Sequence, residues 1–444
     1  MKRYAMDSLK RWKNSADRKP LMIYGARQVG KTWLMKEFGR AEFGNTLYVS
    51  FDKNERARQI FGEDIDPRYI VSRLENDFDT QIDPRRTLLI FDEIQECQRA
   101  KDALKYFCEN APEYHVVAAG SFLGVATGKF PVGQVNTLTV RPMSFYEFLE
   151  AIGRSRLLGA LMGLDSKMIL GMSQTASELL RAYFYVGGMP KAVQAYADTG
   201  DIRKTRELQE EMLDGYRGDF SKHIKGSDIP KVRMLWDTIP AHLAKEKKKF
   251  VYKEVKTGGR ASEFENAMNW LENTGLVHRV SRTQHAKMPL LANLEREHFK
   301  IFMADIGLLC AHSGVDVKTL AQPEINIFDN FRGALTEQFV LQELKALLPK
   351  APILYWANER GHSEVDFVFQ YEGEIIPIEA KSSENARAKS LKAYMDAEKP
   401  ARALRTSLKN FGAKDNLISV PLYMMGSLLE ILDGKQGGGK GGAV

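Results

Sequence analysis

The sequence predicts an α/β protein that begins with a parallel sheet covered by helices on both faces and ends in a second α/β domain. Three observations support this prediction. Short apolar strands alternate with helical patterns up to about residue 148, a glycine-rich loop joins the first strand to a helix, and two late strands flank a Glu372-Gly373 turn. Short buried strands that alternate with helices are typical of parallel sheets.

The chain has 444 residues, which is too long for a single ordinary domain. Periodicity and composition divide it into the α/β core 1–150, a helical subdomain 151–225, a region 226–315, a second α/β domain 322–434 and a Gly-rich tail 435–444. The region 226–315 shows three helices followed by two strands, which is the pattern of a winged helix. The tail is too rich in glycine to fold and is expected to be flexible.

Composition indicates a cytoplasmic protein. No window approaches the run of about 18 apolar residues that a membrane helix needs, and the N-terminus has no apolar signal-peptide core. The three cysteines form no CxxC pair, which argues against a disulfide framework or a thiolate zinc site. The net charge of +7 and the pI of about 9.0 permit a polyanionic partner, but they fit a generic basic protein as well.

The glycine-rich loop has the spacing GxxxxGK[ST]. It follows the strand LMIY, precedes the helical pattern WLMKEF, and consists of Gly25, Ala26, Arg27, Gln28, Val29, Gly30, Lys31 and Thr32. Backbone N–H groups of such a loop wrap phosphates, and the following helix adds the positive end of its dipole. We therefore expect an ATP site in which Lys31 reaches the β- and γ-phosphates and Thr32 holds Mg²⁺.

A second buried strand, TLLIFDE, ends in two carboxylates. Asp92 is expected to support the Mg²⁺ ion, and Glu93 to polarise the attacking water as a general base. Paired acids at this position favour hydrolysis over phosphate transfer to a small molecule. Ser121 closes a third strand, where it either contacts the γ-phosphate or the water, or caps a helix. Arg141 is a candidate arginine finger, although an ordinary surface arginine fits the sequence better.

These segments carry a family resemblance. GARQVGKT, LLIFDE and RPMSFYEFL closely resemble a large bacterial and archaeal family of AAA-type ATPases that carry a C-terminal domain of unknown function. YFYVGGMPKAV, FKIFMADIGLL, FRGALTEQFVLQEL and SEVDFVF…PIEAKSS fit in the same order, so the resemblance spans nearly the whole chain. It implies an ATPase core, a winged-helix region and a nuclease-like C-terminal fold. Gly133-Gln134 departs from the Gly-Arg that is frequent in that family, which puts any phosphate-sensing role there in doubt.

The region 226–315 is basic. Its cationic residues include Lys245, Lys247, Lys248, Lys249, Lys253, Lys256, Arg260, Arg279 and Arg282, interspersed with glutamates. A winged helix with a basic rim can lie on DNA and neutralise phosphates. The alternative is a solvated face of mixed charge on a module that makes domain or subunit contacts, and the sequence leaves both open.

The late hairpin places acidic and basic residues together. If its turn is centred on Glu372-Gly373, Asp366 lies opposite Glu379, and Lys381 shares a face with Glu379. Opposed carboxylates repel unless a divalent cation lies between them. The pattern Asp…Glu-x-Lys is that of the PD-(D/E)XK nuclease fold, with Val365 where a proline usually stands. Glu337 is the acid expected from a preceding helix, and Glu343 is a weaker candidate.

The alternative is an exposed hairpin with ordinary alternating polar residues, and Pro377 is unusual in a central strand. We expect an Mg²⁺-dependent ATPase coupled to a nuclease-like domain that acts on DNA, in processing or defence. In that reading Glu337, Asp366, Glu379 and Lys381 are catalytic, and Asp366 and Glu379 hold a second Mg²⁺ or an Mn²⁺. The alternative function is a non-cutting, ATP-dependent regulatory switch that binds nucleic acid or a protein. Assembly into a homo-oligomer is left open.

Overall fold

The computed structural model describes residues 1–120, 133–224, 226–245, 248–316, 329–358, 363–381 and 389–434. They form two compact units. The N-terminal unit comprises 2–141 with 273–276, and the C-terminal unit comprises Met1, 142–272 and the chain from Val277 onward. The predicted tail 435–444 lies outside the described residues.

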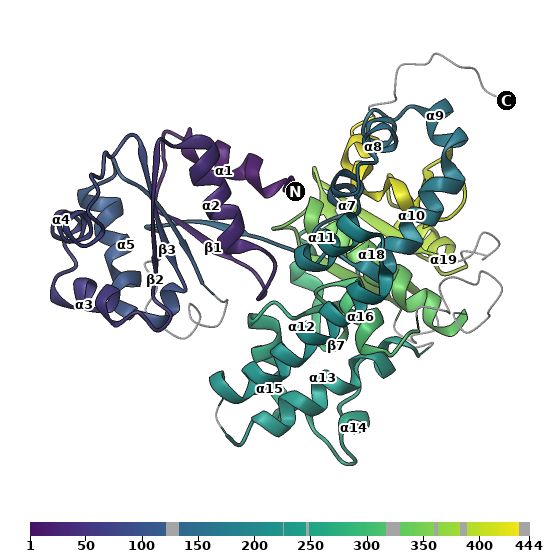
Figure 1. The fold of residues 1–444 in the computed structure, drawn as a ribbon. Helices are drawn as coiled ribbons and strands as arrows, with labels where there is room; N and C mark the ends of the chain where they lie inside the picture. The colour runs from purple at the N-terminus through teal and green to yellow at the C-terminus, as the bar shows by residue number, and fades with distance from the viewer. Residues whose placement is uncertain are drawn as a thin grey trace. The chain divides into compact units, whose positions relative to one another are not determined.

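The N-terminal unit is built on a five-stranded sheet in the order β2-β3-β4-β1-β5, in which all neighbouring strands are parallel. Its strands are β1 (Leu21–Tyr24), β2 (Asn45–Ser50), β3 (Thr87–Asp92), β4 (His115–Ala119) and β5 (Asn136–Thr139). Figure 1 shows α1 and α2 on one side of this sheet and α3, α4 and α5 on the other. These helices span α1 (Ala5–Lys13), α2 (Lys31–Glu42), α3 (Glu55–Glu63), α4 (Pro67–Phe78) and α5 (Gln98–Asn110), with a short 3-10 helix η1 (Ile94–Glu96) before α5.

The central strands of this sheet are apolar because both of their faces are covered. All residues of β1 and of β3 are buried, as expected for a parallel sheet between helices. On the α5 face, the ring of Phe91 packs edge-on against the rings of Phe61 and Phe107. This confirms the predicted α/β fold with a parallel sheet.

The C-terminal unit begins with helices. They are α7 (Phe145–Ala151), α8 (Ser155–Met162), α9 (Ser166–Gly171), α10 (Ser173–Val186), α11 (Pro190–Thr199), α12 (Ile202–His223), α13 (Ile229–Leu243), α14 (Tyr252–Val255), α15 (Ala261–Asn273) and α16 (Ile306–His312). The turn between α10 and α11 packs against the chain before α7, where the N–H of Met143 donates to the carbonyl of Gly188 at 2.6 Å. In the described part of the chain, no helix is both long enough and apolar enough to cross a membrane.

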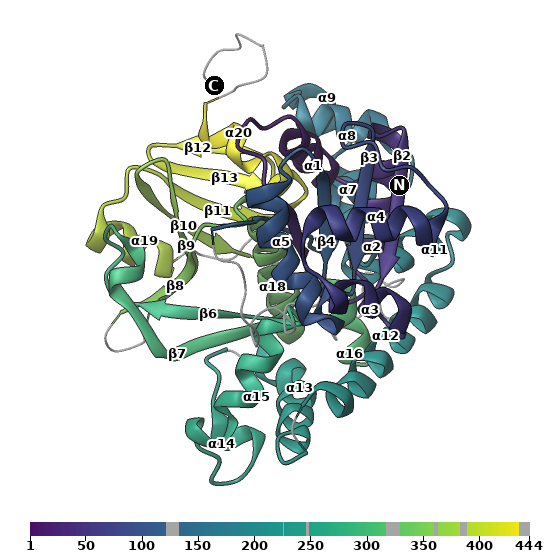
Figure 2. The same ribbon diagram turned by 90° about the vertical axis from the view of Figure 1, so that its left-hand side faces the viewer.

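An eight-stranded sheet completes the C-terminal unit, in the order β12-β13-β11-β10-β9-β8-β6-β7 (Figure 2). Its strands are β6 (Val277–Thr283), β7 (Leu294–Met303), β8 (Ile353–Ala357), β9 (Glu364–Tyr371), β10 (Glu374–Ala380), β11 (Ala403–Ser407), β12 (Gly412–Lys414) and β13 (Leu417–Pro421). The remaining helices of the C-terminal unit are η2 (Leu290–Asn293), α18 (Asp329–Leu347), α19 (Lys389–Glu398), η4 (Leu422–Ser427) and α20 (Leu428–Leu432).

The two strands expected at the end of a winged helix belong to this sheet. β6 pairs with β7 in antiparallel fashion and with β8 in parallel fashion. One sheet therefore contains strands that the sequence analysis placed in two separate domains. β7 ends at Met303, and Asp305 then caps α16 by accepting the N–H of Leu308 at 2.9 Å.

The late hairpin has the register expected from its turn. Tyr371 pairs with Glu374, and the ladder continues to Phe367 opposite Ile378. Glu372 and Gly373 both have positive φ, at 43° and 81°, which is the backbone of a two-residue hairpin turn. Asp366 and Glu379 lie one position beyond this last pair, in the register from which the sequence analysis expects them to face each other.

Candidate functional site

The glycine-rich loop of the N-terminal unit joins β1 to α2 at the carboxyl edge of the parallel sheet. Gly25 has a φ of 153°, and a Cβ there would lie 2.2 Å from the carbonyl oxygen of Val140, so only glycine fits. Gly30 and Gln28 adopt left-handed φ values of 89° and 68°. Such a turn directs consecutive backbone N–H groups to one side, which is the arrangement that binds phosphate oxygens.

Lys31 is folded over the loop. Its Nζ donates to the carbonyl oxygens of Gly25 at 2.9 Å and Ala26 at 3.0 Å. Burial lowers the pKa of Lys31, against the opposing attraction of Glu93 and Asp92. A cation held this way can exchange the two carbonyls for the β- and γ-phosphates of a nucleotide.

Thr32 and Asp92 meet across the carboxyl edge of the sheet. The Thr32 hydroxyl donates to Oδ2 of Asp92 at 2.6 Å, and the Tyr48 hydroxyl donates to the same oxygen at 3.0 Å. Asp92 is 3% exposed. These are the hydroxyl and carboxylate oxygens that Mg²⁺ prefers, so the residues fit the expected ion.

Glu93 follows Asp92 with a left-handed φ of 51°, uncommon for a residue other than glycine and frequent at functional sites. Its Oε2 accepts a hydrogen bond from the Gln95 amide at 2.5 Å, which fixes the carboxylate orientation. The sequence did not single out Gln95, because an amide two residues after an acid carries no motif.

Of the two remaining N-terminal candidates, Ser121 lies outside the described residues. Arg141 directly follows Val140, whose N–H donates to the carbonyl of Tyr24 at 2.7 Å. Arg141 is half-buried, and burial lowers the pKa of its guanidinium group. The guanidinium of Arg3 links Arg141 to the loop, because it donates to the carbonyls of Val29 at 3.0 Å and Arg141 at 2.6 Å.

The late hairpin brings the predicted Asp366, Glu379 and Lys381 together. Nζ of Lys381 lies 2.5 Å from Oε1 of Glu379. The other oxygen of Glu379 accepts the N–H of Leu391 in α19 at 3.2 Å. Oδ2 of Asp366 accepts the N–H of Ala380 at 2.8 Å. Burial and the charge of Glu337 raise the pKa of Asp366, against the attraction of three lysines.

Glu337 reaches this region from α18, but two buried lysines neutralise it. Nζ of Lys248 is bonded to Oε1, and Nζ of Lys300 lies 3.3 Å from Oε2. Lys300 also lies 2.5 Å from Oε1 of Glu364. Burial opposes ionisation of Glu337, yet the two lysines outweigh it and lower its pKa. Lys300 was not among the residues expected from the sequence, where its only signal is a lysine between apolar residues of β7.

Glu343, the weaker candidate acid, lies elsewhere on α18 and has another contact. It is fully buried, and its Oε1 accepts the N–H of Phe145 at the start of α7, at 2.8 Å. Burial raises the pKa of Glu343 to about 8, although the Phe145 N–H opposes the shift. This acid joins α18 to α7.

The carboxylates of the C-terminal unit do not fit the expected second metal ion. Across the described ranges, no three His, Cys, Asp or Glu side chains gather closely enough to hold one. Glu337 and Glu379 each have a lysine as partner, so a cation would have to displace a protein charge.

The basic residues of the region 226–315 are largely paired with acids. Lys245 lies 2.6 Å from Glu254, and Lys256 lies 2.9 Å from Glu263. Arg279 and Arg282 also form ion pairs, with Glu272 and Glu295. Lys248, assigned to a basic rim by sequence, is 8% exposed and bonded to Glu337. These contacts favour the mixed-charge alternative over a continuous DNA-binding rim.

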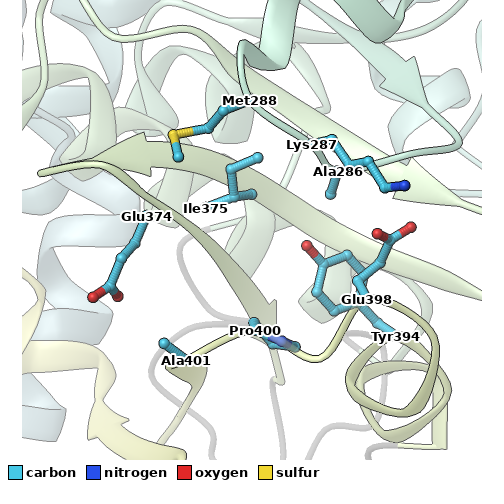
Figure 3. A pocket seen from close by; sticks show the side chains of 9 residues that line it. All are labelled: Ala286, Lys287, Met288, Glu374, Ile375, Tyr394, Glu398, Pro400 and Ala401. Atoms are coloured by element: carbon cyan, nitrogen blue, oxygen red, sulfur yellow. The ribbon is translucent and has the colours of Figure 1, made fainter.

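A pocket of about 240 Å³ opens on the C-terminal unit (Figure 3). It is lined by Ala286, Lys287, Met288, Glu374, Ile375, Tyr394, Glu398, Pro400 and Ala401. None of the predicted site residues lines it, and Glu374 is already paired with Arg402 at 2.8 Å. The pocket is therefore separate from both candidate sites.

Three family models match the chain. Residues 17–149 match an AAA domain, residues 177–319 match the domain of unknown function DUF8612, and residues 332–424 match the domain of unknown function DUF4143. The first match covers the loop, Asp92 and Glu93. The N-terminal unit is therefore an AAA-type P-loop domain, followed by two domains to which no function is attached. No curated protein matches the chain.

Several solved structures are similar at low identity. A Walker-type ATPase of Pyrococcus abyssi is 14% identical over 70% of this chain and 95% of its own, with a TM-score of 0.45. The Aeropyrum pernix ORC1 protein, solved with DNA, is 12% identical over 70% and 90%, with a TM-score of 0.29. A RuvB variant of Thermotoga maritima is 14% identical over 62% and 86%, with a TM-score of 0.30. The assignment of the N-terminal unit thus rests on the family match and on the geometry of its loop.

Proposed function

We propose that this protein hydrolyses ATP with Mg²⁺ at the loop of the N-terminal unit and uses the reaction as a regulatory switch. The observation that carries the proposal is the contact of Thr32 with Asp92 at 2.6 Å, beside the loop and Lys31. It joins the two motifs that an ATPase needs, although 60 residues separate them in the chain.

Some residues of the site bind the nucleotide, and others act in its hydrolysis. The loop from Gly25 to Thr32 binds the phosphates through its backbone N–H groups, and Lys31 neutralises the β- and γ-phosphates. Thr32 and Asp92 would hold Mg²⁺, which neutralises charge on the phosphate oxygens when bound. Glu93, oriented by Gln95, accepts a proton from the water that attacks the γ-phosphate.

Two substitutions separate binding from hydrolysis. Lys31→Ala is expected to abolish both nucleotide binding and turnover, because it removes the charge that the phosphates meet. Glu93→Gln is expected to keep ATP binding and to lower kcat by roughly 10²- to 10⁴-fold, the usual contribution of a general base. Release of phosphate and binding of a fluorescent ATP analogue measure the two properties.

Glu96→Gln is the matched control, because Glu96 is an exposed carboxylate three residues along the same segment. It should leave both properties unchanged. Full turnover by Glu93→Gln would remove the role of Glu93 as a base. Normal ATP binding by Lys31→Ala would refute the phosphate site itself.

For the C-terminal unit, we propose a nuclease-like arrangement that binds a partner and does not cut. The close set of Asp366, Glu379 and Lys381 supports the nuclease-like arrangement, and the lysine pairing of Glu337 supports the absence of cleavage. A time course on single- and double-stranded DNA, with Mg²⁺ or Mn²⁺ and with or without ATP, tests this. Cleavage by the wild type that is lost in Lys381→Ala would establish a nuclease and refute the switch.

A further inference from the structure

The carboxylates of the C-terminal unit enclose a buried lysine. Lys300 lies on β7 between Phe299 and Ile301, and it is 1% exposed. A buried ammonium group is costly unless carboxylates compensate its charge. Its Nζ lies 3.3 Å from Glu337 and 2.5 Å from Glu364, and its charge also acts on Asp366. Burial lowers the pKa of Lys300, but these three carboxylates outweigh it and raise the pKa overall.

The other two lysines of the cluster are also paired with carboxylates. Lys248 bonds the second oxygen of Glu337, and Lys381 pairs with Glu379. The cluster thus contains four carboxylates, Glu337, Glu364, Asp366 and Glu379, and three lysines, Lys248, Lys300 and Lys381. The three ammonium groups therefore compensate most of the negative charge of these carboxylates without any bound ion.

A divalent cation would have to enter this cluster against the lysines. Ammonium groups and metal ions both take positions between carboxylate oxygens, and they exclude each other by charge repulsion. We propose that Lys300 occupies the position of a divalent cation, so that this acid cluster is held together by an internal ammonium group and binds no metal. The proposal deepens the non-cutting role assigned to the C-terminal unit and does not depend on ATP hydrolysis.

The test is whether removal of Lys300 creates a metal site. The full chain is compared as wild type, Lys300→Met and Lys300→Met/Glu337→Gln, without nucleotide, by thermal unfolding and by electron paramagnetic resonance of Mn²⁺. Lys300→Met should lower the unfolding temperature by roughly 10 °C, because it leaves buried carboxylates uncompensated. Added Mn²⁺ should restore most of that loss, and one more Mn²⁺ should bind per chain than in wild type.

The double variant removes the excess negative charge by another route. It should recover stability without Mn²⁺ and bind no additional ion, which separates charge compensation from general damage to β7. Lys392→Met is the matched control, since Lys392 is exposed on α19. A Lys300→Met protein that folds but shows no response to Mn²⁺ would refute the assigned position of Lys300.

If Lys300→Met does not fold, a comparison of wild type with Asp366→Asn still shows whether the acid cluster binds a metal ion. The proposal expects Mn²⁺ to have the same effect on both proteins. Stabilisation of the wild type by Mn²⁺ that Asp366→Asn abolishes would show a working metal site beside Lys300 and overturn the proposal. ATP hydrolysis, measured on the same preparations, should persist in every variant, so a failure of the proposed ATPase remains distinguishable.

Discussion

The buried acid Glu343 makes the stability of the C-terminal unit depend on pH, and Glu343→Gln should remove that dependence. Glu343 accepts the N–H of Phe145 through one carboxyl oxygen, and within the described residues its other oxygen has no hydrogen-bond partner. The carboxyl group is fully buried, which raises its pKa to about 8 from an ordinary value near 4.5. Glutamine keeps the acceptor for Phe145 but cannot ionise.

The direction in which stability changes with pH follows from the number of protons that the folded and unfolded states bind. Between pH 4.5 and 8 the folded protein holds a proton on Glu343 and the unfolded chain does not. Stability from this group is therefore lost as pH rises, at about 1.4 kcal/mol per pH unit. From pH 5.5 to 7.5, the free energy of unfolding of wild type should fall by about 3 kcal/mol relative to the glutamine variant.

Differential scanning calorimetry at pH 5.5, 6.5 and 7.5 measures the effect on the transition of the C-terminal unit. The quantity to compare is the difference in stability between wild type and Glu343→Gln at each pH. Burial also raises the pKa of Asp305, to about 6, but Asp305 contributes equally to both proteins and cancels in this difference. Glu207→Gln, at an exposed position on α12, controls for the loss of one carboxylate. Parallel profiles for wild type and Glu343→Gln would refute the argument that Glu343 is buried in its neutral form.

Two glycine substitutions test close backbone contacts. A Cβ at position 188 would lie 2.0 Å from the carbonyl oxygen of Met143, so Gly188→Ala should lose about 3 kcal/mol or more of stability, measured from its urea midpoint. Gly25→Ala, with a Cβ 2.2 Å from the carbonyl oxygen of Val140, should weaken binding of a fluorescent ATP analogue at least tenfold by distorting the loop. Gly218→Ala on α12 meets no atom within 4 Å and serves as the control. A Gly188→Ala protein as stable as wild type would contradict the first expectation. A Gly25→Ala protein that binds the analogue as tightly as wild type would contradict the second.

The sequence predicted the features that depend on neighbouring residues. The spacing from Gly25 to Thr32 sets a phosphate loop between a strand and a helix, and the structure shows that loop. The turn at Glu372-Gly373 determined the hairpin register, because a two-residue turn fixes which residues face each other. The side chains around Asp366 could be placed on one face from that register alone.

The sequence could not predict ion pairs between residues that lie far apart in the chain. Lys248 was assigned to a DNA-binding rim because it lies in a run of basic residues, but folding buries it against Glu337, 89 residues away. The joining of β6 to β8 was equally hidden, since pairing between distant strands leaves no local pattern.

By itself, then, the sequence determined the position of the phosphate loop, because such a loop is encoded by the spacing of a few consecutive residues. The tertiary structure decided the partners of the acids around the hairpin, because only folding brings Lys300 to Glu337 and Glu364. Local spacing fixes which acids share a face. Only the packed fold determines whether a metal ion or a lysine neutralises them.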